Sequence, residues 1–147
     1  EFLWSPTTAG FFQKGRTYFV GAEIFLSESE KYYNVVQIRG ANNRTIRQRF
    51  PVTYSAWRPF SDRGAIANWF GEPGTVMVDS FRVGLLICFE PFIYLPGFTT
   101  MILRPDVLVV CSNHWWCRNS NISLFSDKIS ASWALLYDVP LVLAKNT

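Results

Sequence analysis

Charged residues are scarce in this chain of 147 residues. They make up 17% of the sequence, whereas hydrophobic residues make up 49% and aromatic residues 17%. This composition excludes a disordered chain and supplies enough apolar side chains for a sizeable core. Because so few charges are unusual for a freely exposed surface, we expect a missing segment, a partner or a membrane to cover part of it.

Long hydrophobic runs, cysteines and basic clusters are also few. A membrane-spanning helix needs about 18–20 apolar residues, and the longest apolar region, Val83–Phe98, is interrupted by Glu90 and two prolines. Three cysteines are too few for a disulfide scaffold. The net charge is only +3 and the basic residues are scattered, apart from Arg44, Arg47 and Arg49. We therefore expect no nucleic-acid partner.

The first half of the chain predicts strands. Arg16–Leu26 and Tyr33–Arg39 are rich in aromatic and β-branched residues, and the charged turn Glu28–Lys31 joins them as a hairpin. Thr45–Phe50 predicts a third strand. Tyr54–Gly74 contains prolines, glycines and aromatics without periodicity, so it is predicted to be a long functional loop.

The second half alternates strands with helices, which predicts an α/β layered fold. Strands are expected at Thr75–Val78, Arg82–Cys88, Asp106–Cys111 and Val139–Ala144, and helices at Pro91–Leu103 and Ser120–Tyr137. We expect the first helix to be interrupted near Pro96–Gly97. The second has apolar residues at helical spacing, which predicts one buried face made of Ile122, Phe125, Ile129, Trp133 and Leu136.

The segment CSNHWWC, Cys111–Cys117, has the spacing C-x2-H-x2-C that suggests a metal site. A structural zinc site needs four ligands, and this segment offers three, including the only histidine of the chain, His114. We therefore expect no metal. The segment is better explained as a loop at the carboxyl end of a buried strand, where α/β proteins collect ligand-contacting residues.

Cys88 ends the apolar run LLIC and is followed by Glu90 and Pro91. A small cysteine at a strand end often only packs in a core. Alternatively, Cys88 is a nucleophile on a strand-to-helix turn, where the positive end of a helix dipole would lower the pKa of its thiol. Such a nucleophile needs a base, for which the sequence offers His114 or Glu1, and His114 beside tryptophans is also typical of a structural role.

Five segments in order resemble the nitrilase superfamily of carbon–nitrogen hydrolases, and within it the apolipoprotein N-acyltransferases and the TraB group of conjugal-transfer proteins. They are GRTYFVGAEIF, YYNVVQIRG, VGLLICFEPFIYLP, DVLVVCSNHWW and SASWALLYDVPLVLAKNT. The resemblance implies an α-β-β-α sandwich. The chain starts at Glu1 and ends after a strand-like run, so we interpret residues 1–147 as a partial domain that lacks the first strand and helix and the C-terminal end.

The family uses a glutamate base, a lysine and a cysteine nucleophile, and the resemblance places these roles on this chain. Cys88 matches the nucleophile, Glu90 a supporting glutamate, and Glu1 the base. Counting back from Trp57–Pro59 places Gln48 at the lysine position. The residues expected to contact substrate are Phe89, Asn113, His114 and Trp115.

Gln48 is the departure that matters for chemistry. A lysine ammonium would stabilise the thiolate and the oxyanion, and losing one oxyanion donor slows catalysis by about 10²–10³-fold. A glutamine supplies a neutral hydrogen bond but no charge. Because side chains alternate along a strand, Arg47 and Arg49 are expected to face away from Gln48. If the strand bulges, however, an arginine can still reach in.

Two functions follow from the resemblance. The first is a cofactor-free thiol hydrolase or N-acyltransferase that acts on a small acyl or lipid-like substrate through a thioester. The second is an impaired enzyme retained as a structural component of a conjugation apparatus. The resemblance also implies the periplasmic face of a bacterial inner membrane, membrane association through missing segments and a homo-oligomer. An unrelated α/β domain is the remaining alternative.

Overall fold

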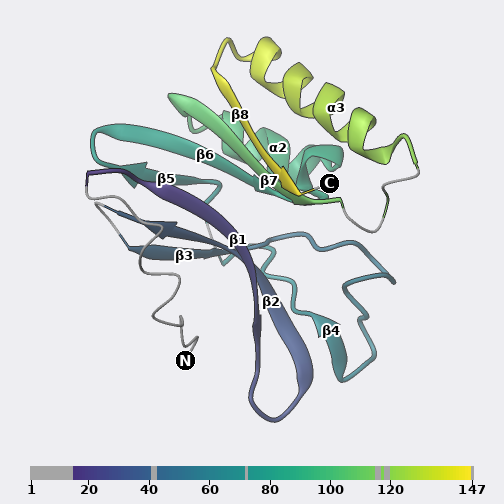
Figure 1. The fold of residues 1–147 in the computed structure, drawn as a ribbon. Coiled ribbons are helices and arrows are strands. Elements are labelled where there is room, and N and C mark those ends of the chain that lie inside the picture. Colours follow the sequence, from purple (N-terminus) through teal and green to yellow (C-terminus); the bar gives the residue numbers. More distant parts are fainter. Residues whose placement is uncertain (1–14, 41–42, 72, 115–116, 118–119, 147) are drawn as a thin grey trace.

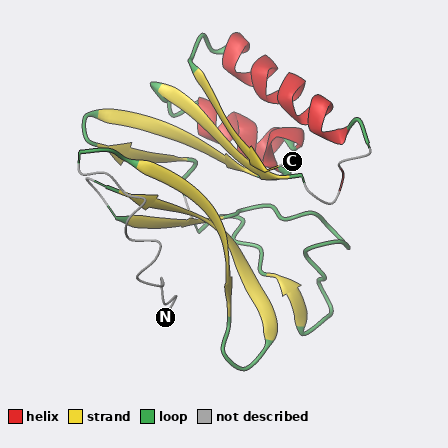
Figure 2. Ribbon diagram, viewed as in Figure 1, coloured by secondary structure: helices red, strands yellow, loops and turns green. Residues whose placement is uncertain are grey.

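The computed structural model describes residues 15–40, 43–71, 73–114, 117 and 120–146. These residues form two sheets that pack face to face, with helices on the outer face of one of them (Figures 1 and 2). The elements are β1 (Tyr18–Phe25), β2 (Glu30–Arg39), β3 (Arg44–Arg47), β4 (Arg63–Ala65), β5 (Thr75–Val78), β6 (Phe81–Ile87), the 3₁₀ helix η1 (Glu90–Phe92), α2 (Tyr94–Met101), β7 (Val107–Asn113), α3 (Ile122–Leu136) and β8 (Leu141–Asn146).

The first sheet is built on the β1–β2 hairpin. β1 and β2 pair antiparallel from Tyr18 opposite Arg39 to Phe25 opposite Tyr32, and β3 adds to the other edge of β2. The predicted hairpin is confirmed, although β2 begins at Glu30, inside the charged segment expected to form the turn. Backbone pairing extends the strand into residues of low strand propensity, because each added pair satisfies further N–H and C=O groups.

The sequence predicted an irregular loop over residues 54–74, but this segment contains a short strand. It contains β4, which pairs parallel with the start of β2, from Arg63 opposite Glu30 to Ala65 opposite Tyr32. Three residues of sequence Arg-Gly-Ala have no strand signature of their own. The strand forms because the edge of β2 offers unpaired backbone groups there.

The second sheet has the order β5–β6–β7–β8, with an antiparallel β5–β6 hairpin and three parallel strands. One core cluster lies between the two sheets and includes Val36, Ile38, Leu85 and Val109. The other lies between the second sheet and the helices and includes Leu86, Met101, Leu108 and Ala134. The mixed α/β prediction is confirmed. Within the described ranges, helices cover only the second sheet (Figure 2).

The first predicted helix is interrupted earlier in the sequence than we expected. Ile93 is extended and separates η1 from α2, whereas Pro96 and Gly97 lie inside α2. Pro96 is the third residue of α2, where the N–H group has no intrahelical acceptor, so a proline is tolerated. Gly97 allows a close contact, since an added Cβ would lie 2.4 Å from the Trp133 ring.

The buried face of α3 is not the predicted one. Ser126, Ser130 and Ala134 are its buried residues, while Phe125 is 56% exposed and Leu136 is 73% exposed. Short side chains let the helix backbone approach the sheet, and Ser130 keeps its hydroxyl bonded to the carbonyl of Ser126. The apolar spacing therefore predicted the helix correctly but assigned its inner face wrongly.

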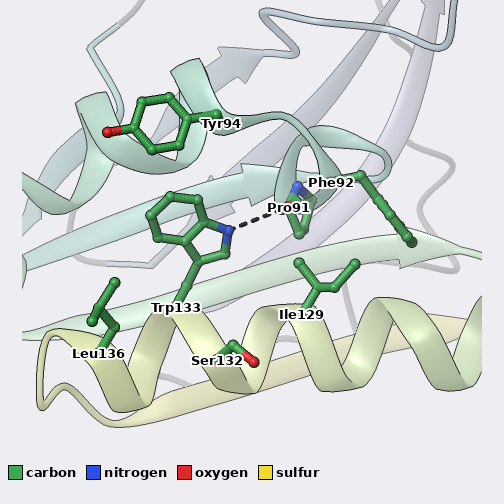
Figure 3. A pocket seen from close by; sticks show the side chains of 7 residues that line it. All are labelled: Pro91, Phe92, Tyr94, Ile129, Ser132, Trp133 and Leu136. Atoms are coloured by element: carbon green, nitrogen blue, oxygen red, sulfur yellow. Dashed lines mark hydrogen bonds between the residues drawn. The ribbon is translucent and has the colours of Figure 1, made fainter.

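Trp133 connects α3 to the segment that follows Cys88. Its Nε1 donates a hydrogen bond of 2.9 Å to the carbonyl oxygen of Pro91 (Figure 3). Around it lies a groove of about 350 Å³ lined by Pro91, Phe92, Tyr94, Ile129, Ser132, Trp133 and Leu136. In the described part of the chain, no helix is long and apolar enough to cross a membrane.

Replacing Gly97 with alanine tests this packing. At an open helix position the change would stabilise the protein by about 1 kcal/mol. Because the new methyl group would overlap Trp133, we expect Gly97→Ala to lower the free energy of unfolding by about 1–3 kcal/mol in a urea titration. Gly21→Ala is the control, since an added Cβ at Gly21 meets nothing within 4 Å. Equal stability of the two variants would contradict the contact.

Candidate active site

Cys88 lies in a sharp turn at the carboxyl end of β6. Its backbone has φ = +56°, a left-handed conformation that residues with a side chain rarely adopt. The N–H of Cys88 donates to the carbonyl oxygen of Cys111 on β7 at 2.7 Å, and η1 begins two residues later. A left-handed non-glycine residue costs on the order of 1–3 kcal/mol, and such strain concentrates at functional sites.

The surroundings of Cys88 raise the pKa of its thiol. Burial is the largest cause, and the negative charge of Glu90 adds to it, whereas the backbone N–H groups of Asn113 and Phe89 act in the opposite direction. The expectation of a lowered pKa was therefore wrong. The following helix η1 has only three residues, so its dipole is small and desolvation dominates.

Glu90 is a buried carboxylate that accepts hydrogen bonds from β6 and from the segment that follows β3. Its Oε1 accepts from the backbone N–H of Arg49 at 2.6 Å and of Phe50 at 3.2 Å. Its Oε2 accepts from the N–H of Ile87 at 2.9 Å and from the Arg49 guanidinium at 3.3 Å. Glu90 therefore fixes the end of β6 against the segment that follows β3.

Arg49 supplies the positive charge that this buried carboxylate needs. The side chains of Arg49 and Glu90 are 6% and 1% exposed. The same Arg49 nitrogen, Nη2, donates to the carbonyl oxygen of Leu85 at 3.2 Å and to the hydroxyl of Thr100 at 2.9 Å. The guanidinium thus joins the segment that follows β3 to β6 and α2.

Gln48 lies beside the cysteine turn, with its side-chain amide fully engaged. Its Nε2 donates to the carbonyl oxygens of Ile87, at 2.8 Å, and Phe50, at 3.3 Å. Its Oε1 accepts from the Asn34 amide at 2.8 Å. The structure therefore brings Gln48 next to the residue that precedes Cys88.

Of the two flanking arginines, only Arg47 points away from Gln48 as strand alternation predicted. Arg49 lies beyond the end of β3, and its buried guanidinium turns to β6, the strand to which Gln48 also bonds, so the prediction was wrong for Arg49. Arg47 lies over the ring of Tyr33, 4.2 Å from its centroid, while the Arg49 guanidinium pairs with Glu90. Neither guanidinium takes the place of the lysine that the resemblance predicts at position 48.

The other predicted site residues divide into two groups. Phe89 stacks on Phe92, with ring centroids 5.1 Å apart, and Asn113 ends β7 with its N–H near the Cys88 thiol. These two adjoin the cysteine. Glu1 and Trp115 lie outside the described residues.

His114 turns toward α3. It is buried, and its Nδ1 lies 3.1 Å from the Ser123 hydroxyl. Burial and, to a lesser extent, the Lys145 ammonium lower the pKa of His114, although Asp127 opposes them. These contacts favour the structural interpretation of His114 over a role as base. Among the described residues, no cluster of histidine, cysteine and carboxylate side chains could hold a metal ion.

The sequence did not single out Asn34 or Arg49 as parts of the site. Asn34 could have been found from strand alternation, because it shares a face of β2 with Val36 and Ile38, which enter the core. Arg49 has no such signal, since a buried arginine cannot be distinguished from an exposed one by its neighbours in the sequence.

The fold is that of the nitrilase superfamily. A mutant of an amidase of this superfamily from Nesterenkonia AN1 superposes with a TM-score of 0.62 at 9% identity, over 89% of this chain and 47% of the amidase. A carbon–nitrogen hydrolase from Helicobacter pylori G27 also gives 0.62, at 12% identity, over 86% of this chain and 45% of the hydrolase. No family model matches the sequence.

By sequence, the chain is a homologue of the TraB conjugal transfer proteins. It is 31% identical to the probable conjugal transfer protein TraB of Sinorhizobium fredii and 29% identical to TraB of Agrobacterium fabrum. Both alignments include 99% of this chain but only 40% and 37% of the relatives. The predicted resemblance to the nitrilase superfamily and the TraB group is confirmed, and the chain spans about two fifths of these relatives.

Arg49→Met tests how much the buried ion pair of Arg49 and Glu90 contributes to the stability of the fold. The variant keeps an unbranched side chain but leaves the Glu90 charge without its partner, so we expect a loss of about 3–5 kcal/mol in the free energy of unfolding. Arg47→Met is the matched control: this exposed arginine gives up one aromatic contact, a loss of about 0.5–1 kcal/mol. A similar small loss in both variants, measured by denaturant titration, would show that Arg49 does not stabilise Glu90.

The raised pKa of Cys88 predicts slow alkylation at neutral pH. Only the thiolate reacts with iodoacetamide, so the rate at Cys88 should rise with pH through a midpoint above that of a cysteine in a short peptide. Peptide mass spectrometry separates Cys88 from Cys111, whose pKa burial raises to about 11. A midpoint below that of the peptide thiol would mean that burial is not the dominant influence on Cys88.

Proposed function

We propose that the chain contributes the nucleophile region of a cysteine-dependent carbon–nitrogen hydrolase or N-acyltransferase. The observation that supports this most directly is the strained turn at Cys88. It holds the thiol at the carboxyl end of a parallel strand, beside the N–H groups of Phe89 and Asn113. Tyr54, Asp79, Arg104 and Asp138 also have a left-handed backbone. Cys88 differs from them because it carries a thiol at the end of a buried parallel strand, beside two backbone N–H groups.

The proposed reaction passes through a thioester. Glu1 accepts the proton of Cys88, and the thiolate attacks the carbonyl carbon of an amide or ester to give a tetrahedral oxyanion. The oxyanion collapses, the bond to the amine or alcohol breaks, and the proton on Glu1 passes to that leaving group. Water or an acceptor amine then attacks the thioester and regenerates the thiol. A base is essential here because the pKa of the thiol is raised.

The substrate class rests on the surroundings of the thiol. Phe89 and Phe92 form a stacked aromatic pair next to the turn, and Trp115 follows Asn113, the last residue of β7, by two positions in the sequence. Such side chains suit an acyl or lipid-like group. The names of the relatives support a role in conjugal transfer. We propose the periplasmic face of the inner membrane, membrane association and a homo-oligomer from the family resemblance alone.

A second candidate function is a structural component of a transfer apparatus without catalysis. The contacts of Gln48 favour it, because both N–H groups of its amide already bond to backbone carbonyls, so neither is available to an oxyanion. Without the lysine, only the backbone N–H groups of Asn113 and Phe89 oppose the rise in the pKa of the Cys88 thiol. The two functions differ in one measurable respect, the formation of a thioester on Cys88.

Incubation with p-nitrophenyl octanoate distinguishes these functions. The enzyme hypothesis predicts an octanoyl adduct on Cys88 in the intact mass spectrum of the full chain, and its loss in Cys88→Ser. Iodoacetamide alkylation at high pH serves as the control that the thiol of the folded protein is accessible. A wild type that alkylates but acquires no octanoyl group would refute the enzyme hypothesis and support the structural function.

Restoring the lysine is the companion test. In Gln48→Lys the ammonium can donate to the carbonyl oxygen of Ile87, and a rotated Asn34 amide can accept from it, so the buried charge keeps partners. Because a positive charge beside the turn stabilises the thiolate and the oxyanion, we expect faster octanoylation, by on the order of 10-fold or more. Gln48→Met, which removes the hydrogen bonds without adding charge, is the control. Unchanged or slower labelling in a folded Gln48→Lys variant would show that position 48 does not correspond to the lysine.

A further inference from the structure

The apolar stripe of α3 lies beside a groove instead of in the core. Ile129, Trp133 and Leu136 belong to the face that the sequence predicted to be buried, yet α3 buries a different face. These three side chains line the groove around Trp133 (Figure 3). At spacings of four and three residues they lie on one side of the helix. The stripe that does not enter the core therefore forms one wall of the groove.

The segment that follows the cysteine turn forms the other wall. Pro91 and Phe92 of η1 and Tyr94 of α2 line it, and the Nε1 of Trp133 joins the two walls through its hydrogen bond of 2.9 Å to the Pro91 carbonyl oxygen. The Tyr94 ring lies 6.1 Å from the Trp133 ring. The groove measures about 350 Å³, and none of its seven lining residues carries a charge. Such a groove suits an uncharged, apolar ligand.

The groove begins close to the nucleophile turn. Phe92 lines it and stacks on Phe89, with ring centroids 5.1 Å apart. The N–H of Phe92 donates to the carbonyl oxygen of Phe89 at 3.1 Å, which closes a turn whose end Cα atoms lie less than about 7 Å apart. Because Phe89 directly follows Cys88, the Cα atoms of Cys88 and Phe92 lie within about 11 Å of each other. Aromatic side chains thus continue from the residue after the cysteine into the groove.

We propose that this groove binds the hydrocarbon chain of the acyl group whose carbonyl carbon Cys88 attacks. This rests on the proposed function and deepens it, because it assigns a site to the chain of the substrate. An octanoyl chain has seven C–C bonds of about 1.5 Å each, so its length is comparable to the separation of Cys88 and Phe92. Contact with Ile129 and Trp133 removes apolar surface of the chain and of the protein from water, which favours long acyl chains over short ones.

The preference for chain length tests this assignment. The acylation rate of Cys88 in the full chain is measured with p-nitrophenyl acetate and with p-nitrophenyl octanoate. Each rate is divided by that of N-acetylcysteine with the same ester, which removes the intrinsic reactivity of the ester. Because each buried methylene group strengthens binding, we expect the corrected rate to be higher with octanoate by on the order of 10–100-fold.

Ser132→Phe fills the groove from an exposed helix position. Ser132 lines the groove, and its hydroxyl donates to the Lys128 carbonyl oxygen of the same helix at 2.9 Å. The added ring takes the place of the chain, so the octanoate-to-acetate ratio should fall by on the order of 10-fold or more. Ala131→Phe is the matched control, because Ala131 is the exposed preceding residue of α3 and does not line the groove. An equal fall in both variants overturns the assignment.

A ketone probe examines the groove without acyl transfer. 2-Nonanone has an octanoyl group with a methyl group in place of the leaving group, so it forms no thioester. At a pH at which Cys88 alkylates, 2-nonanone should slow the reaction of Cys88 with iodoacetamide at concentrations at which acetone does not. In Ser132→Phe the concentration that gives half protection should rise by on the order of 10-fold or more, whereas Ala131→Phe should match the wild type.

The two probes separate failure of this inference from failure of the proposed function. If the wild type is acylated, the ester ratios decide: no preference for octanoate, or a preference that persists in Ser132→Phe, refutes the groove while the proposed function stands. If the wild type is not acylated but 2-nonanone protects Cys88 and Ser132→Phe loses this protection, the groove is supported and the proposed function is refuted. If neither acylation nor protection occurs, both are refuted.

A second pair of variants covers the case in which Ser132→Phe does not fold. Leu136 lines the groove and is 73% exposed, whereas its neighbour Leu135 is 84% exposed and does not line it. A lysine ammonium is strongly hydrated and opposes hydrocarbon beside it. Leu136→Lys should therefore lower the octanoate-to-acetate ratio and Leu135→Lys should not. Equal ratios in these two variants overturn the proposal.

Discussion

The buried carboxylate of Glu90, together with its partner Arg49, connects the segment after β3 with β6, η1 and α2. It accepts backbone N–H groups from the end of β6 and from the segment after β3, and its charge is balanced by Arg49. A buried carboxylate is tolerated only when its partners are complete. The turn at Cys88 and the position of Gln48 both depend on this one group, because it fixes the end of β6, which precedes the cysteine, to the segment after β3 that contains the glutamine.

Most of the fold could be predicted from the sequence, because continuous apolar runs and helical spacing are local properties. The strands that end at Arg39 and Ile87 and the helix Ile122–Leu136 follow from them. β4 could not be predicted, since its residues form a strand only where the edge of β2 offers partners. The inner face of α3 was also missed. Short side chains on the inner face of a helix allow its backbone to lie close to the sheet. A pattern of hydrophobic residues does not indicate where such short side chains are needed.

The candidate site was predictable in part for the same reason. Cys88 stands at a visible break between an apolar strand and a proline, and counting from Trp57–Pro59 placed Gln48 beside it. The pKa of Cys88 was not predictable, because it depends on burial by residues far away in the sequence. Nor was the role of Arg49, which is set by Glu90 and Thr100, 41 and 51 positions further along the chain.

The left-handed backbone of Cys88 has a consequence for how this protein can change over generations. Glycine adopts that conformation without strain, so a Cys88→Gly substitution would relieve part of the local strain energy. If the thiol had no function, Cys88→Gly would be a stabilising substitution. A single nucleotide change in a TGT or TGC codon is enough to produce it. That substitution would also remove the sulfur, so this turn can have either a relaxed backbone or a thiol, but not both.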